Sequence, residues 1–388
     1  MPVITTFPYI QYGGIWTASQ QADAKAAGTW PVPPAIKLYS WGSNAQGQLG
    51  LDNTTNYSSP KQVGALNDWL SLSGSRPLGA FAIAIKANGT LWAWGKNNQG
   101  MLGTGNITYQ SSPVQVGALT TWYKISAGEN STFAIKTDGT LWSWGSGVVG
   151  QLGLGNETSY SSPKQVGSLT NWAFVSGGRN YAAAIKTDGT LWAWGQNNFG
   201  KLGLGDTTSR SSPVQVGSLT NWAIVSANGY HTLAIKTDGT MWAWGNGAQG
   251  TLGLSNLTTY SSPKQVGALT NWLNVSAGYY NSVAVKADGT LWTWGTGANG
   301  QLGLGNTTGY SSPKQVGLLT NWLQVVSSYG FCSAIKTDGT LWTWGFNSSG
   351  QLGLGDTANR SSPTQIGLLT TWTVVAQTGY ASLGIARN

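Results

Sequence analysis

Residues 135–155 read IKTDGTLWSWGSGVVGQLGLG, and close copies of this stretch recur along most of the chain. The full copies begin at Ile85, Ile135, Ile185, Ile235, Val285 and Ile335, and a shortened copy begins at Leu38. Successive full copies are therefore 50 residues apart. A repeat of this period is typical of solenoids, arrays and propellers, in which each repeat is one supersecondary unit.

Each copy predicts four short β-strands and no helix. In one copy the predicted strands span residues 172–176, 181–186, 190–195 and 213–216. The second and third are joined by Thr187-Asp188-Gly189, and an Asp-Gly pair between apolar runs is a strong signal for a tight hairpin. Trp192 and Trp194 fall on one side of the third predicted strand and apolar residues fall on the other, so we expect neighbouring sheets to cover both faces.

Three sequence markers give the number of repeats. The Trp-Gly pair, the Ser-Ser-Pro motif and the tryptophan that opens the first predicted strand each occur seven times. The chain stops in the middle of a repeat and Leu38 resumes it in register, so residues 373–386 are expected to pair with residues 38–42. The sequence predicts an all-β fold, a seven-bladed β-propeller of four-stranded antiparallel blades. Pairing of the N-terminal strand with the C-terminal strands would close the ring and remove its free sheet edges.

The stretch from Gly339 to Gly353 has the pattern Gly-x-Leu-x-x-Trp-Gly-x-Asn-x-x-Gly-Gln-Leu-Gly. This pattern resembles the repeat of the regulator of chromosome condensation family of seven-bladed propellers, and the resemblance covers Leu38 to Asn388. It implies the propeller fold and, as a functional expectation, a nucleotide-exchange factor for a small GTPase or a chromatin-bound regulator. The relevant members act through a protruding wedge and charged loops, whereas this chain's insertion into the repeat is three residues near Pro77. A shared fold does not by itself fix the function.

Composition limits the classes of partner. The formal net charge is +8, which alone would suggest nucleic acid, but charged residues make up only 8% of the chain. Many lysines lie beside an aspartate, as Lys136 does with Asp138, and like charges form no run, so we predict no nucleic-acid partner. The single cysteine, Cys332, excludes an internal disulfide and is predicted to be a small core residue. No run of about 20 apolar residues is present, so no membrane insertion is predicted.

Residues 1–35 lie outside the repeats, and residues 36–388 form the predicted propeller. Residues 17–28 predict a short helix that is capped by Thr17 or Ser19 and ended by Gly28, and residues 30–34 predict a stiff proline-rich linker. A helix against the propeller wall and an anchor in a larger assembly are both compatible with this pattern. The leader motifs Gly-Ile-Trp-Thr (14–17), Gln-Gln (20–21) and Gly-Thr-Trp-Pro (28–31) are also similar to leaders of virion-associated proteins of tailed phages. That resemblance implies an anchor on a phage particle, and residues 1–14 lack a secretory signal.

The copies differ most in the loop between the first and second predicted strands. This loop and the long third-to-fourth loop are expected on one face, opposite a nearly uniform face of Asp-Gly turns. Tyrosine, arginine and asparagine in such loops are typical of a recognition surface, and neutral drift in loops is the alternative. The candidate ligand-binding residues are Arg76, Leu78, Glu129, Asn130, Arg179, Asn180, Tyr181, Tyr230, His231, Tyr279, Tyr280, Asn281, Tyr329, Phe331 and Tyr380.

Catalytic chemistry finds little support in the sequence. His231 is the one histidine, and no spacing pairs it with Cys332 as a base for a nucleophile. Asp138 and its equivalents occupy hairpin turns, where aspartate is favoured for backbone reasons. The glycine-rich loops lack the following helix and the Lys-Ser/Thr ending of a phosphate-binding loop. We therefore expect no catalytic residue, no metal, no cofactor and no enzymatic activity.

These features lead to the hypothesis of a non-catalytic phage virion protein in a tail fibre, spike or capsid decoration. In this hypothesis residues 1–35 contact other virion proteins, the variable loops bind a host-surface glycan or protein, and the protein leaves the cell by lysis. The alternative is a cytoplasmic regulator, such as a small-GTPase nucleotide-exchange factor or a chromatin-associated propeller. Nucleotide release from a panel of GTPases would discriminate between the two.

Overall fold

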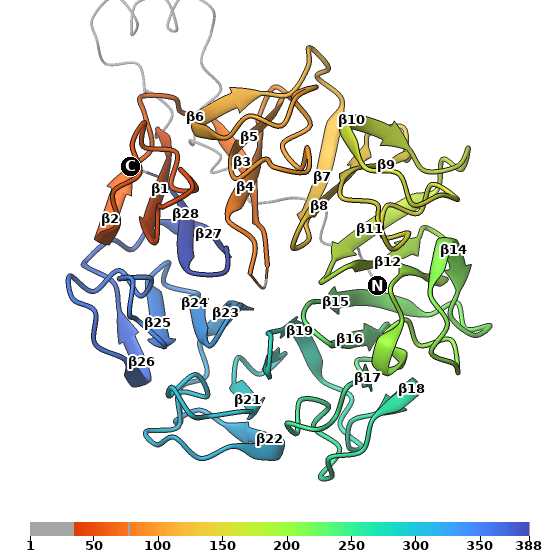
Figure 1. The fold of residues 1–388 in the computed structure, drawn as a ribbon. Coiled ribbons are helices and arrows are strands. Elements are labelled where there is room, and N and C mark those ends of the chain that lie inside the picture. The colour runs from red at the N-terminus through yellow and green to blue at the C-terminus, as the bar shows by residue number, and fades with distance from the viewer. Residues whose placement is uncertain (1–34, 77, 388) are drawn as a thin grey trace, which may run out of the picture. The chain divides into compact units, whose positions relative to one another are not determined.

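The computed structural model describes residues 35–76 and 78–387, and the predicted leader helix and linker lie outside this part of the chain. The chain divides into two units after Ala35, and the unit that starts at Ile36 contains the β-strands. Figure 1 shows this unit as a ring of sheets around a central axis, with the first strand of each sheet nearest the axis.

Six of the seven sheets consist of four strands that are consecutive in the chain. The first blade contains β3 (Trp69–Gly74), β4 (Phe81–Lys86), β5 (Leu91–Gly95) and β6 (Gln110–Gln115). The next five blades keep this order, with the 3-10 turn η1 (Asn198–Gly200) in the long loop of the third blade. Their strands are β7 (Trp122–Ala127), β8 (Ser131–Lys136), β9 (Leu141–Gly145) and β10 (Tyr160–Gln165); β11 (Trp172–Gly177), β12 (Tyr181–Lys186), β13 (Leu191–Gly195) and β14 (Arg210–Gln215); β15 (Trp222–Ala227), β16 (His231–Lys236), β17 (Met241–Gly245) and β18 (Tyr260–Gln265); β19 (Trp272–Ala277), β20 (Asn281–Lys286), β21 (Leu291–Gly295) and β22 (Tyr310–Gln315); β23 (Trp322–Ser327), β24 (Phe331–Lys336), β25 (Leu341–Gly345) and β26 (Arg360–Gln365).

The seventh blade joins the two ends of the chain. Its strand order is β2-β1-β28-β27, with β27 (Trp372–Gln377) and β28 (Ala381–Arg387) from the C-terminal end and β1 (Ile36–Gly42) and β2 (Tyr57–Gln62) from the N-terminal end. The antiparallel register of β1 and β28 runs from the pair Ile36 and Arg387 to the pair Gly42 and Ala381, and the two strands lie side by side in Figure 1. The predicted seven-bladed propeller and its closing strand pair are confirmed.

The fourth strand of a blade begins earlier than its sequence predicts. In the third blade β14 begins at Arg210, three residues before the predicted start at Pro213. Ala193 pairs with Val214 but Gly195 pairs with Arg210, so extra residues bulge out of β14 between these two pairs. Pro213 lies in this bulge, where a residue that cannot donate a backbone hydrogen bond is tolerated. The Ser-Ser-Pro motif therefore lies within an irregular outer strand.

The second tryptophan of each third strand fills the space between two blades. Trp144, Trp194 and their equivalents are at most 1% exposed. Trp194 Nε1 donates to the carbonyl of Gln151 in the preceding blade at 3.0 Å, and its ring contacts Phe133 of that blade with centroids 6.1 Å apart. Gly153 has a φ of +74°, and a Cβ atom there would lie 2.7 Å from Trp194 Nε1. The glycine of the Gln-Leu-Gly motif therefore provides both the turn and the room for the neighbouring indole.

The hairpin turns between the second and third strands carry one repeated side-chain module. In the third blade Asp188 Oδ1 accepts from the Thr190 backbone N–H at 2.9 Å and from Thr190 Oγ1 at 2.7 Å, and Thr190 Oγ1 accepts from Trp192 Nε1 at 2.8 Å. Lys186 Nζ lies 3.7 Å from the centroid of the Trp192 ring, where cation–π attraction applies. Burial lowers the pKa of Lys186 more than the nearby Asp188 raises it. We call this side of the ring the turn face.

Candidate functional site

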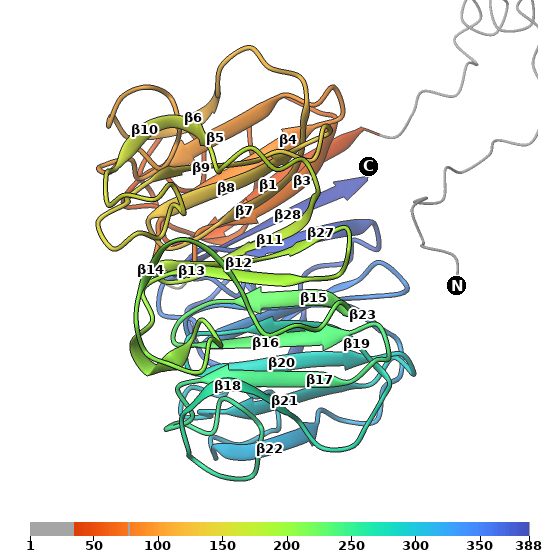
Figure 2. The same ribbon diagram turned by 90° about the vertical axis from the view of Figure 1, so that its right-hand side faces the viewer.

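Two kinds of loop emerge together on the side of the ring opposite the turns. The end of a third strand is tied to the short loop before the second strand, because the N–H of Gln196 donates to the carbonyl of Asn180 at 2.8 Å. The same bond joins Lys96 to Ala80 in the first blade, at 2.9 Å. In Figure 2 the long loops, including that of η1, lie on one side of the ring and the hairpin turns on the other. We call the side with the short and long loops the loop face.

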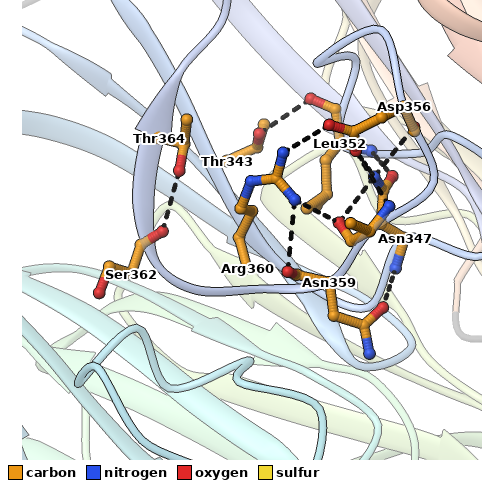
Figure 3. A network of polar contacts seen from close by, with 9 residues as sticks. Thr343, Asn347, Leu352, Asp356, Asn359, Arg360, Ser362 and Thr364 are labelled. Atoms are coloured by element: carbon orange, nitrogen blue, oxygen red, sulfur yellow. Dashed lines mark hydrogen bonds and ion pairs between the residues drawn. The ribbon is translucent and has the colours of Figure 1, made fainter.

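Asparagine side chains brace several of the long loops. Asn347 Nδ2 donates to the carbonyls of Asp356 and Ala358, and Asn347 Oδ1 accepts from the Leu352 backbone N–H at 2.9 Å, which ties both ends of one loop together (Figure 3). The ion pair of Arg360 Nη2 with Asp356 Oδ2, at 2.5 Å, closes the same loop from outside. The backbone N–H of Ala358 and the bond from Arg360 lower the pKa of Asp356. Equivalent braces occur at Asn44, Asn97 and Asn197.

Tyrosines from four consecutive blades touch one another on the loop face. Centroids are 5.2 Å apart for Tyr230 and Tyr279, 4.3 Å for Tyr279 and Tyr280, 5.1 Å for Tyr279 and Tyr329, and 5.2 Å for Tyr329 and Tyr380. Gly229 leaves room for this contact, because a Cβ atom there would lie 2.8 Å from the ring of Tyr279. Burial of Tyr279 raises the pKa of its hydroxyl, which therefore stays protonated and can donate.

Arg179 extends this row of rings to two further blades. Its Nη1 donates to the hydroxyl of Tyr230 and to that of Tyr279, the latter at 2.6 Å, and its Nε pairs with Glu129 Oε2 at 3.1 Å. Desolvation raises the pKa of Glu129 and outweighs the opposing effect of Arg179. We refer to Glu129, Arg179, Tyr230, Tyr279, Tyr280, Tyr329 and Tyr380 together as the loop-face arc.

Lys201 lies beneath the arc and contacts Arg179. The sequence did not lead us to predict this residue. The side chain is buried, and its Nζ donates to the Arg179 carbonyl at 2.9 Å and lies 4.9 Å from the centroid of the Tyr181 ring. Burial, followed by the charge of Arg179, lowers the pKa of Lys201 to about 7. The signal was present in the repeats, because the other copies have Gln, Met or Thr at this position.

Four predicted binding residues are inaccessible to a ligand in this structure. Tyr181, His231, Asn281 and Phe331 open the second strands of consecutive blades, and each is at most 1% exposed. Tyr181 donates its hydroxyl to the His231 carbonyl at 2.8 Å, and His231 Nε2 lies 2.8 Å from Ser282 Oγ. These side chains point between blades because successive residues of a strand alternate in direction. Desolvation lowers the pKa of His231 to about 3, so the imidazole is neutral near pH 7.

The remaining predicted residues have separate environments. Leu78 is exposed on the loop face, and Asn130 and Asn180 are half-buried, with their carbonyls engaged in the loop ties described above. Arg76 turns inward and donates to Ser276 Oγ and the Ser327 carbonyl on the far side of the ring. The structure thus brings seven of the predicted residues into one arc, and it directs Arg76 to the central axis instead.

Among residues 35–76 and 78–387, no group of three or more His, Cys, Asp or Glu side chains could hold a metal ion. Cys332 is buried, as predicted for a small core residue, and desolvation raises the pKa of its thiol to about 12. Among these residues, no helix combines the length and the hydrophobicity that a transmembrane span requires.

The regulator of chromosome condensation (RCC1) repeat matches seven successive stretches of the chain. They are residues 37–75, 88–135, 138–185, 188–235, 238–285, 288–335 and 338–381. The chain belongs to this family. Each match from residue 88 to residue 335 spans the third and fourth strands of one blade and the first two strands of the next, so the sequence repeat is offset from the blades by half a blade.

Relatives of the chain share short stretches of it. Residues of the human probable E3 ubiquitin-protein ligase HERC3 are 34% identical over 99 residues, 25% of this chain and 9% of that protein. The Danio rerio RCC2 homolog is 36% identical over 72 residues, 19% of this chain and 14% of that protein. The chain thus spans less than a sixth of the length of these two relatives. Prp20p of Saccharomyces cerevisiae, studied for its binding to Gsp1p and histones, shares the fold, with a TM-score of 0.81, 20% identity and 92% of each chain covered.

These relatives overturn the hypothesis of a phage virion protein. They are a probable ubiquitin ligase and an RCC2 homolog of animals, and the fold is that of a yeast protein characterised with Gsp1p and histones. The partner predictions that belong to this hypothesis are also wrong. They were virion proteins bound through residues 1–35 and a host-surface glycan or protein bound through the variable loops. The relatives favour the alternative of a regulatory propeller, and they give no support to a location in a virion.

Proposed function

We propose that this propeller is a non-catalytic regulator that binds a partner protein through the loop face. The observation that carries the proposal is the loop-face arc, in which side chains from six blades form one connected row around the ring. Tyrosine and arginine are the residues enriched at the energetic centres of protein interfaces, because they offer large, rigid contact area and several donors. The turn face, by contrast, repeats one module and offers no comparable distinct site.

The arc has a rigid base and an accessible edge. Tyr279 is 6% exposed and holds the row together, whereas Tyr280 is 39% exposed and the nearby Phe199 is 41% exposed. The ring of Phe199 contacts Tyr230 with centroids 5.7 Å apart, so it extends the accessible aromatic surface. Side chains that are already ordered lose little entropy on binding, which favours this edge as the place where a partner docks.

We propose a small GTPase inside the cell as the partner and nucleotide release as the regulated step. The support is the family itself, together with the study of Prp20p and its binding to Gsp1p. Such a regulator needs no covalent chemistry, because it only has to stabilise the nucleotide-free form of its partner.

The test is release of a fluorescent guanine nucleotide from purified small GTPases, with Gsp1p as the first member of the panel. We expect the full chain to accelerate release from at least one member, and Tyr280→Ala with Phe199→Ala to abolish the effect. Leu318→Ala is the matched control, since Leu318 is 91% exposed in a link between blades on the turn face. Acceleration that survives the loop-face change, or no acceleration of any member, would contradict the proposal.

A further inference from the structure

The innermost strand of each blade is its first strand, and in the seventh blade this is β27. These seven strands surround a central cavity of about 410 Å³. The cavity is lined by the third residue of every first strand, namely Ser71, Lys124, Phe174, Ile224, Asn274, Gln324 and Val374. The tryptophan two positions earlier is the same in all seven strands, whereas these cavity residues differ in every blade. The repeat is thus least regular where it faces the axis, and the volume is of the size that encloses small molecules.

A relay of five serine hydroxyls links six consecutive blades around the axis. Ser73, Ser126, Ser176, Ser226 and Ser276 each accept a hydrogen bond from a backbone N–H of the next blade, at 2.9–3.1 Å. The relay ends after Ser276, because the sixth and seventh blades have Val326 and Ala376 at the equivalent position.

Arg76 reaches the point where the serine relay stops. It lies in the loop that carries the three extra residues of the first blade, and its Nη1 donates to Ser276 Oγ at 3.1 Å and to the Ser327 carbonyl at 3.0 Å. The guanidinium therefore crosses from the first blade to the fifth and sixth. Both bonds use Nη1, so Nε and Nη2 have no acceptor among the described residues.

The cavity has positive charge and free donors but no carboxylate. Arg76 and Lys124 line it, and no Asp or Glu is among its lining residues. Desolvation lowers the pKa of Arg76 to about 10 and also lowers that of Lys124, whose Nζ donates to the Ala173 carbonyl at 2.7 Å. Within the described chain, the side-chain amides of Asn274 and Gln324 have no hydrogen-bond partner. An enclosed cation without a counter-charge is unfavourable, and an anion in the cavity would offset that cost.

We propose that the central cavity binds a small oxyanion, a phosphate or carboxylate group, which is held by the free Nε and Nη2 of Arg76. The planar fork of a guanidinium matches such a group with two parallel hydrogen bonds. The amides of Asn274 and Gln324 add neutral donors from the fifth and sixth blades, the two blades to which the guanidinium of Arg76 is bonded. This site is separate from the loop-face arc, so its occupancy and partner binding are measured independently.

The test is isothermal titration of the full chain with inorganic phosphate and, separately, with citrate, in a chloride buffer. We expect saturable binding of at least one of the two anions, and the anion that binds more tightly identifies the class. Arg76→Met should weaken that binding roughly tenfold or more, the loss typical of a charged hydrogen-bonding pair. Arg360→Met is the matched control, since this arginine lies outside the cavity in an ion pair with Asp356, and it should leave the affinity unchanged.

A second variant keeps the test valid if Arg76→Met does not fold. Ile224→Glu leaves Arg76 intact and places a carboxylate in the cavity, so it should weaken anion binding through charge repulsion. Circular dichroism verifies the fold of each variant. The proposal is overturned if neither anion binds at millimolar concentration, or if a folded Arg76→Met or Ile224→Glu protein binds with the affinity of the wild type.

Discussion

In the turn module the side-chain hydrogen bonds join residues two positions apart, whereas in the loop-face arc they join residues about 50 or 100 positions apart. The bond from Thr190 to Asp188 is an example of the first kind, and the bonds from Arg179 to Tyr230 and Tyr279 are examples of the second. Each turn is therefore specified by its own blade. The loop-face arc exists only when six blades stand in their final places, so it is a property of the ring and not of the repeat.

The largest expected effect on stability comes from the tryptophans packed between neighbouring blades, on which both faces depend. Trp194→Ala should lower the free energy of unfolding by about 3–5 kcal/mol, because it removes a fully buried indole and leaves a cavity between two blades. Urea denaturation followed by circular dichroism measures this loss. A variant with the midpoint of the wild type would show that the blades do not depend on these rings.

The next effect concerns the buried layer beneath the arc and depends on pH. The pKa of His231 falls from an ordinary 6.5 to about 3 in the folded chain, so the unfolded chain binds more protons between these values. The contribution of His231 to the free energy of unfolding is therefore fully present above pH 6.5 and is lost as the pH falls towards 3. The loss is about 2 kcal/mol by pH 5.

The His231 effect is isolated by comparing the wild type with His231→Gln in urea melts from pH 7 to pH 5. The difference between the two proteins should change with pH, whereas effects of carboxylates common to both cancel. Because the chain has one histidine, a single imidazole signal in proton NMR reports its titration. A signal that titrates near pH 6.5 in the folded protein would exclude the buried neutral imidazole.

A smaller effect tests the non-local bonds of the loop face. Arg179→Met should destabilise the fold by about 1–2 kcal/mol, because Glu129 and two tyrosine hydroxyls lose their partner in partly buried positions. The loss should shrink in the Glu129→Gln background, which a double-mutant cycle measures. The exposed pair Arg210 and Asp206 is the control and should show weak coupling. Equal coupling in the two pairs would remove the distinction between arc and surface.

The smallest effect tests whether the turns are independent modules. Thr190→Val keeps the shape of the side chain but removes the hydroxyl between Asp188 and Trp192, and it should cost about 1 kcal/mol. Thr240→Val in the next blade should cost the same within about 0.5 kcal/mol, since its contacts are identical in kind. Chemical denaturation of both variants makes the comparison. Unequal losses would mean that turns sense their neighbours.

The same distinction explains what the sequence could predict. The number of blades, the hairpin turns and the closing strand pair follow from local patterns that recur seven times, and all were predicted. The loops of the arc could be located because they interrupt the repeat. The sequence could not predict which residues of these loops face solvent. A shift of one position along the strand turns Tyr181 or His231 between the blades, while Tyr230 and Tyr280 stay on the loop face. The inward path of Arg76 depends on Ser276 and Ser327, some 200 and 251 residues away.

The closing strand pair has a consequence for the order of folding. β1 begins at Ile36 and its central partner β28 ends at Arg387, so β1 leaves the ribosome long before β28 does. At the usual rate of about 5–20 residues per second, β1 and β2 remain without their sheet for tens of seconds while six complete blades form ahead of them. During that interval both strands have open edges that another nascent chain can join. The last step of folding is therefore also the step at which exchange of strands between two copies competes with closure of the ring.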